Sequence, residues 1–243
     1  ISYYNIPWSK CIVIENAITP IDKQLITKSL DQIKLIYHTT PHRGLEILVP
    51  VFEKLCEKYD NIELDVYSSF NIYGWAERDE QYKELFERCK NNPKINYHGT
   101  VSNDEVRNAL AKANIFAYPS IWPETSCISL MEAMSAECIC IHPNYAALFE
   151  TSSGMTLMYQ WQETPNIHAS MFYNQLDGVI SQLQKGGAGL EGVKIQKGYA
   201  DLRFNWQRTQ TIWTSVLEAL SRTYKKVESR EISKGVFHYK SGS

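Results

Sequence analysis

Short apolar runs rich in β-branched and aromatic residues alternate with amphipathic stretches of helical period along most of the sequence. A strand, a helix and a further strand in succession build a parallel β-α-β unit with a right-handed crossover. The expected strands are residues 34–38, 62–67, 95–98, 115–118, 138–141 and 155–158. The sequence therefore predicts an α/β fold with a Rossmann-like doubly wound parallel sheet, in which ligands bind at the carboxyl ends of the strands.

Two local signals refine the expected helices. Ser102 and Glu105 have the spacing of a capping box, which satisfies two free backbone N–H groups at a helix start. Pro50 lies inside a helix expected over residues 44–58, and it should delay or kink that helix because proline lacks an N–H. Further helices are expected over residues 78–90, 127–135, 171–183 and 206–224.

The chain is expected to divide into three parts. Residues 1–33 form a connecting arm with one short strand at residues 11–15, residues 34–224 form the α/β domain with its C-terminal helices, and residues 225–243 form a loose polar tail. The first residues show neither an initiator Met nor the layout of a signal peptide. We therefore expect a piece of a longer protein, whose targeting signals are not visible here.

Charge and cysteine content exclude several classes of protein. A formal net charge of -2 gives no basic excess for binding nucleic acid or an anionic membrane. No apolar run reaches the roughly 20 residues of a transmembrane segment. The six cysteines are scattered and form no C-x-x-C pair, which favours reduced thiols in a cytoplasmic protein.

The segment from Tyr118 to Met134 joins an expected strand to an expected helix, and Glu124 lies just before the helix begins. Around the first turn of the helix lie Thr125, Ser126, Cys127 and Ile128. Free backbone N–H groups and the positive end of the helix dipole meet in this turn. It is therefore a site for an anion such as a diphosphate.

A second glutamate, Glu132, lies about 7 Å further along the helix axis, with its side chain leaning back toward the helix start. Its carboxylate is placed to accept two hydrogen bonds from a vicinal diol such as a ribose. Glu124 is placed to meet hydroxyl groups of a sugar beyond the diphosphate.

This segment resembles the Glu-x7-Glu motif of retaining GT-B glycosyltransferases, glycosyltransferase family 4, also described as glycosyl transferases group 1. Glu124, Glu132, Ala133 and Met134 match the family pattern, whereas Ser126-Cys127 stands where the family has Phe-Gly. The resemblance implies that the fold is the C-terminal half of a GT-B fold.

A second match lies upstream, where residues 39–46 resemble the family loop whose Lys-Gly or Arg-Gly opens the first helix of this domain. The loop contains Thr40, Arg43 and Gly44. The resemblance assigns Arg43 to neutralising the donor diphosphate, a task for which the planar guanidinium is well shaped.

Three further positions complete the resemblance, which runs from about residue 11 to residue 220. The family often has another Arg about five residues before the loop cation, a place that falls near His38 here. Asn16 resembles the asparagine at the hinge into this domain, and Gly99 resembles a strand-end glycine near the donor.

The resemblance implies that residues 34–224 bind a nucleoside-diphosphate sugar, such as a UDP or GDP sugar, for retaining transfer to a hydroxyl acceptor in glycan biosynthesis. Glu124 and Arg43 are then catalytic: Glu124 holds and polarises the donor sugar, and Arg43 stabilises the leaving diphosphate. The residues expected to bind the donor are Glu132, Thr125, Ser126, Cys127, Ile128, Thr40, Gly44 and Gly99.

No cofactor and no metal is expected, because these groups replace the cation and the sequence has no Asp-x-Asp pair. The expected partner is an N-terminal acceptor-binding domain, on the same chain or on a second one. The 243-residue chain is therefore expected to be inactive alone.

Other interpretations remain open at this point. The two glutamates also fit a solvated helix face, and the chain also fits a non-catalytic nucleotide-sugar-binding or assembly module. A nicotinamide-dependent dehydrogenase lacks support, because no G-x-G-x-x-G follows the first strand. His38, His98 and His142 are expected to be hydrogen-bonded strand-end residues, and Trp206 and Trp213 fit core or inter-domain packing.

Overall fold

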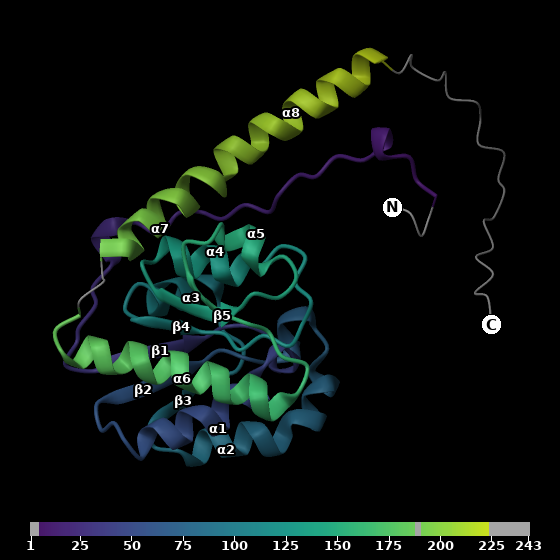
Figure 1. Cartoon of the computed structure of the whole chain (residues 1–243). Coiled ribbons are helices and arrows are strands. Elements are labelled where there is room, and N and C mark those ends of the chain that lie inside the picture. The colour runs from purple at the N-terminus through teal and green to yellow at the C-terminus, as the bar shows by residue number, and fades with distance from the viewer. Residues whose placement is uncertain (1–4, 188–190, 224–243) are drawn as a thin grey trace, which may run out of the picture. The chain divides into compact units, whose positions relative to one another are not determined.

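The computed structural model describes residues 5–187 and 191–223. The chain divides into two compact units, one comprising Glu15–Trp206 and the other comprising Ile1–Ile14 and Gln207–Ser243. The first unit carries the sheet and helices α1 to α7 (Figure 1). The described part of the second unit contains a short 3-10 helix, Trp8–Lys10, and all but the first residue of helix α8, Trp206–Thr223.

A six-stranded parallel sheet forms the centre of the first unit, with the strand order β3-β2-β1-β4-β5-β6. Its strands are β1 Ile33–Tyr37, β2 Ile62–Val66, β3 Ile95–Tyr97, β4 Ile115–Ala117, β5 Ile139–Pro143 and β6 Leu157–Tyr159. The chain builds outward from β1 through β2 to β3, then returns to the other side of β1 and builds outward through β4. The predicted doubly wound sheet is confirmed, and its order reverses between β1 and β4, the place where such sheets bind ligands.

Helices cover both faces of this sheet (Figure 1). Helix α1 packs with α2 and α6 on one face, and α4 packs with α3, α5 and α7 on the other. The bounds are α1 Leu45–Cys56, α2 Lys83–Asn91, α3 Asn103–Leu110, α4 Ile128–Ser135, α5 Leu148–Ser152, α6 Pro165–Gln184 and α7 Glu191–Arg203.

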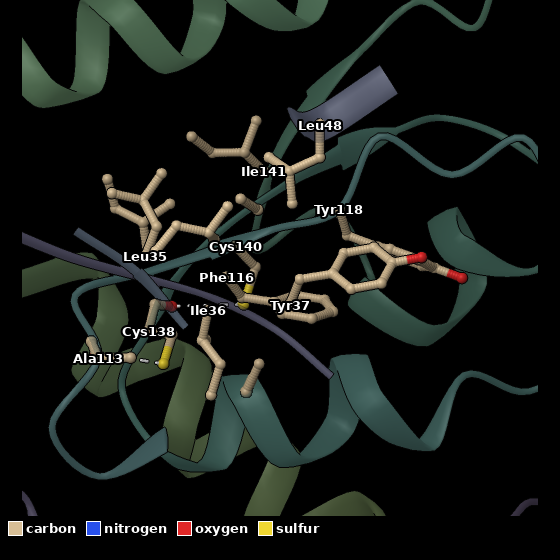
Figure 2. Packing of buried hydrophobic residues seen from close by; sticks show 14 of the residues in the cluster. Leu35, Ile36, Tyr37, Leu48, Ala113, Phe116, Tyr118, Cys138, Cys140 and Ile141 are labelled. Carbon is tan, nitrogen blue, oxygen red and sulfur yellow. Dashed lines mark hydrogen bonds between the residues drawn. The ribbon is translucent and has the colours of Figure 1, made fainter. Parts of the chain in front are cut away.

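The core lies along the central strands. Figure 2 shows Ile36 and Tyr37 of β1 close to Phe116 of β4 and Cys140 of β5, all of them buried. A sheet covered by helices on both faces buries consecutive residues of its central strands, so these strands consist of continuous apolar runs. This burial explains why the sequence pattern located the strands within about a residue or two.

The start of α3 confirms the predicted capping box. The Ser102 side chain accepts from the amide of Glu105, and the Glu105 carboxylate accepts from the amide of Ser102. By contrast, only the second part of the helix expected over residues 78–90 is α-helical, because the 3-10 helix Ala76–Tyr82 precedes α2. The Asp79 carboxylate accepts hydrogen bonds from Ser69 and Phe70, and such local bonds compete with regular helix formation.

Pro50 was expected to delay or kink the helix, and the delay is wrong. Helix α1 begins at Leu45 and includes Pro50. The amide that proline lacks would have bonded to the carbonyl of Glu46, and both residues lie on the exposed side of the helix. That carbonyl can bond to water instead, so the proline is tolerated.

The strand expected at residues 11–15 is also wrong, since these residues join no strand and Ile12 and Val13 are exposed. The compact unit includes residues from Glu15 onward, and Ile18 and Ile21 are buried in its core. Trp213, which was expected in packing, is 49% exposed. The tail expected over residues 225–243 lies outside the described residues.

None of the helices in the described parts of the chain combines the length and the apolar character needed to cross a membrane.

The turn into α1 packs directly against the loop after β4. Gly44 has a φ of 132°, a conformation that residues with a side chain rarely adopt. A Cβ atom at this position would lie 2.3 Å from the carbonyl oxygen of Pro119. The amide of Ile121 also donates to the carbonyl of Arg43, over 3.2 Å. The glycine therefore allows the loops after β1 and β4 to touch.

Gly44→Ala is expected to lower the free energy of unfolding by about 2 kcal/mol or more, because backbone strain and the contact with Pro119 act together. Urea denaturation followed by circular dichroism measures this loss. Gly74→Ala is the matched control, because Gly74 also has a positive φ but has open space at its Cβ position. Its loss should be about 1 kcal/mol, and equal losses for both variants would contradict the role of the Pro119 contact.

Candidate functional site

The loop that follows β1 forms one wall of the site. Residues Pro41–Arg43 make a single 3-10 turn. The Tyr37 hydroxyl donates to the carbonyl of Thr40 over 2.9 Å, and the Arg43 Nε donates to the Thr40 hydroxyl over 3.1 Å. These bonds fix the position of the guanidinium at the carboxyl end of β1.

The loop that follows β4 brings Glu124 to the same place. This side chain is buried, with 6% of its surface exposed. Its Oε1 accepts hydrogen bonds from the Tyr118 hydroxyl and from Nη1 of Arg43, whereas its Oε2 has no partner among the residues that the structure describes. The structure thus pairs the two residues that were predicted to be catalytic and leaves one oxygen of the carboxylate open.

Burial and pairing act in opposite directions on the charges of this cluster. Burial alone lowers the pKa of Arg43, but the bond to Glu124 outweighs it and raises that pKa. Burial raises the pKa of the Tyr118 hydroxyl well above its usual value, and the Glu124 charge adds to the shift. Arg43 therefore stays a cation and Tyr118 stays a hydrogen-bond donor at neutral pH.

The first turn of α4 points free donors toward this edge of the sheet. Cys127 is the N-cap residue, and it provides no side-chain cap bond. In residues 5–187 and 191–223, the amides of Thr125, Ser126 and Ile128 have no hydrogen-bond acceptor. Asn16, expected at the hinge, donates to the carbonyl of Ser126 over 3.3 Å. The free amides and the helix dipole together favour an anion here.

A pocket of about 230 Å³ lies beside the helix start. Four of the predicted donor-binding residues line it: Thr40, Gly99, Ile128 and Glu132. Among the other lining residues are Tyr67, Ile72, Tyr73 and Asn103, which were not predicted to lie in the site. Arg43 and Glu124 do not line this pocket but lie next to it, since Arg43 bonds to Thr40.

Glu132 is a second buried carboxylate, with 6% of its surface exposed. Its Oε1 lies 3.5 Å from both Nη1 of Arg107 and Nδ2 of Asn103. Its Oε2 lies 3.9 Å from Nε2 of His38. Burial raises the pKa of Glu132, while Arg107 and Asn103 oppose the rise. Arg107 was not predicted, and it also donates to the carbonyl of Pro20 over 3.2 Å.

The three strand-end histidines differ in their partners. As expected, His98 is bonded to Asp65 at 2.8 Å, and His142 is bonded to the carbonyl of Pro143 and to Thr156. For His38, neither ring nitrogen has a partner of good hydrogen-bond geometry within the described part of the chain, although the backbone of Ser129 lies near enough to offset part of the effect of burial on the pKa of His38. The ring packs against Phe116, and burial lowers the pKa of His38 to about 3.

No group of three or more His, Cys, Asp or Glu residues is arranged to hold a metal ion in the part of the chain that the structure describes.

Comparison with known proteins gives one family and a consistent fold. The model of the family described as Glycosyl transferases group 1 matches residues 21–151. A search of curated proteins found no match.

Solved structures share the architecture at low sequence identity. A glycosyltransferase from Rickettsia africae ESF-5 is 18% identical with a TM-score of 0.70, over 91% of this chain and 60% of that chain. Sucrose-phosphate synthase from Thermosynechococcus elongatus is 15% identical with a TM-score of 0.64, over 86% and 50%. HepE from Anabaena, solved in complex with UDP-glucose, is 14% identical with a TM-score of 0.58, over 85% and 57%.

These likenesses show the fold of one half of a GT-B glycosyltransferase. The chain spans between 50% and 60% of the length of these three structures.

The buried His38 predicts a loss of stability in acid. An unfolded histidine takes up a proton as the pH falls below about 6.5, whereas folded His38 stays neutral down to about pH 3. Its contribution to stability is therefore complete above pH 6.5 and is lost as the pH falls toward 3. Between pH 7.5 and pH 5.0 it accounts for a drop of about 2 kcal/mol in the free energy of unfolding.

His38→Gln should remove most of that drop, as measured by urea denaturation at both pH values. The difference between the two pH values is the readout, so a constant effect of the substitution on stability cancels. A drop of unchanged size in the variant would mean that other groups cause the acid sensitivity.

Proposed function

Since this chain belongs to the glycosyl transferases group 1 family, we propose that it binds a nucleoside-diphosphate sugar and serves its retaining transfer to a hydroxyl acceptor. One observation carries the proposal: a cation, a helix start with free amides and two buried carboxylates converge at the carboxyl ends of β1 and β4. These are the groups needed to bind a diphosphate that joins a ribose to a sugar.

The diphosphate would lie between Arg43 and the first turn of α4. When the bond between the sugar and the phosphate breaks, negative charge accumulates on the leaving diphosphate. A guanidinium and fixed backbone amides stabilise that charge without having to reorganise. Nη2 of Arg43 has no hydrogen-bond partner among the described residues, so the guanidinium can bond to a phosphate while it stays paired with Glu124. In this mechanism the protein's own groups take the role of a metal ion.

The two carboxylates would bind the two ends of the donor. Glu132 lines the pocket and is proposed to bind the ribose, and the open Oε2 of Glu124 is proposed to accept a hydroxyl of the transferred sugar. HepE was solved in complex with UDP-glucose, which supports a UDP sugar as the first donor to test. The six cysteines are free, which supports a reducing compartment such as the cytoplasm.

A separate acceptor-binding domain is the proposed partner, because this chain spans only about half of its structural neighbours. The same observation favours the second candidate function, a non-catalytic nucleotide-sugar-binding or assembly module. The two candidates differ in whether sugar is transferred once an acceptor-binding domain is present.

Arg43→Ala is expected to weaken the binding of UDP or GDP about tenfold or more while changing the binding of the corresponding nucleoside little, because the cation meets only the phosphates. Isothermal titration calorimetry measures both affinities. Arg43→Lys is the matched variant, since it keeps the charge but loses the planar fork, and its loss should be smaller.

Glu132→Gln gives the contrasting pattern in the same assay, since a ribose contact serves the nucleoside and the nucleotide alike. Both ligands should then bind about tenfold more weakly.

Equal losses of affinity for nucleoside and nucleotide in the Arg43→Ala variant would contradict the proposed contact between Arg43 and the diphosphate.

The 243-residue chain is expected to bind donor but to transfer no sugar by itself. Domain closure aligns the reactants and excludes water, and an acceptor domain supplied on the same chain or in trans should restore transfer. Radiolabelled sugar transfer to a panel of hydroxyl acceptors, with and without that domain, is the measurement. Donor binding without transfer in both cases would favour the non-catalytic module, and transfer by the chain alone would contradict the need for a partner domain.

A further inference from the structure

The imidazole of His38 is a buried polar group that the proposed donor contacts do not yet use. Its side chain is 4% exposed, and it lines the pocket that also contains Glu132. Neither ring nitrogen has a partner of good hydrogen-bond geometry among the described residues, and the nearby backbone of Ser129 offsets the effect of burial on the pKa of His38 only in part. A buried polar group without a partner costs free energy, so a ligand in the pocket that supplied the partner would recover that cost.

The geometry around Glu132 indicates where this ligand group would lie. Arg107 and Asn103 approach Oε1 of Glu132, and Oε2 faces His38. The distance of 3.9 Å between Oε2 and Nε2 is too long for a direct hydrogen bond. This separation leaves room for one ligand oxygen beside the two atoms, within hydrogen-bonding distance of both Oε2 and Nε2.

The chemistry of the two partners selects the kind of oxygen. A carboxylate only accepts hydrogen bonds, and its charge repels a phosphate oxygen. A hydroxyl donates its one proton to Oε2 and accepts a bond from Nε2–H. Burial keeps the imidazole neutral, with one N–H and one acceptor nitrogen, and the Nε2–H tautomer is the one that fits.

We propose that His38 and Glu132 together bind one hydroxyl of the donor ribose, and that His38 thereby makes the site selective for ribonucleotides over deoxyribonucleotides. This inference rests on the proposed function, since it specifies how the nucleotide part of the donor is recognised. His38 is then a specificity-determining residue of the pocket, through a contact that a deoxy analogue cannot make.

Calorimetric titration of UDP and GDP, each compared with its 2′-deoxy and 3′-deoxy analogues, tests the proposal. The wild-type chain should bind the ribonucleotide about tenfold or more tightly than one of the two analogues. His38→Phe should lower this ratio severalfold, to the part that Glu132 alone provides, while it leaves the affinity for that analogue nearly unchanged. His38→Gln, whose side-chain amide also offers an N–H, should keep most of the discrimination and so covers the case in which the Phe variant does not fold.

His98→Gln is the matched control, because His98 is a strand-end histidine that does not line this pocket, and its ratio should equal that of the wild type. An equal loss of affinity for ribonucleotide and analogues in His38→Phe would overturn the inference while leaving the proposed function standing. So would a wild type that binds nucleotide without discriminating between ribose and deoxyribose. A wild type that binds neither UDP nor GDP would overturn the proposed function, and this inference with it.

Discussion

The contact between the loop after β1 and the loop after β4 is the constraint on which the site depends. The two strands are neighbours because the chain reverses its direction of growth between them. Gly44 lets the carbonyl of Pro119 approach, and the Ile121 amide fixes the distance by bonding to the carbonyl of Arg43. With these loops in contact, the guanidinium of Arg43 pairs with the carboxylate of Glu124.

The two glutamates are held in the same way. Each has one oxygen engaged by a guanidinium and one oxygen left for another group: Arg43 bonds to Glu124, and Arg107 bonds to Glu132. Buried charges are expensive unless they are paired, so the arginines reduce the cost of burying the carboxylates. An open oxygen on each carboxylate gives the site two hydrogen-bond acceptors in fixed positions.

Much of this arrangement could be predicted from the sequence, because the strands consist of continuous apolar runs and the capping box at Ser102 is a local pattern. Glu124, Glu132 and Arg43 could be predicted as site residues because they follow strands of a parallel sheet, and the carboxyl ends of such strands lie together at one edge. Arg107 could not be, because nothing in its own helix indicates that α3 faces Glu132. The lack of a partner for His38 was also unpredictable, since a missing hydrogen bond depends on the whole tertiary surrounding.

The bond from Arg107 to the carbonyl of Pro20 links the pocket to the chain segment that leads into the sheet. The same guanidinium approaches the carboxylate of Glu132. Arg107 is thus held at one end by the backbone at Pro20 and at the other end lies against the carboxylate of Glu132. One side chain therefore joins the wall of the pocket to the segment that enters the sheet, so the position of Glu132 and the path of the chain at Pro20 share a common support.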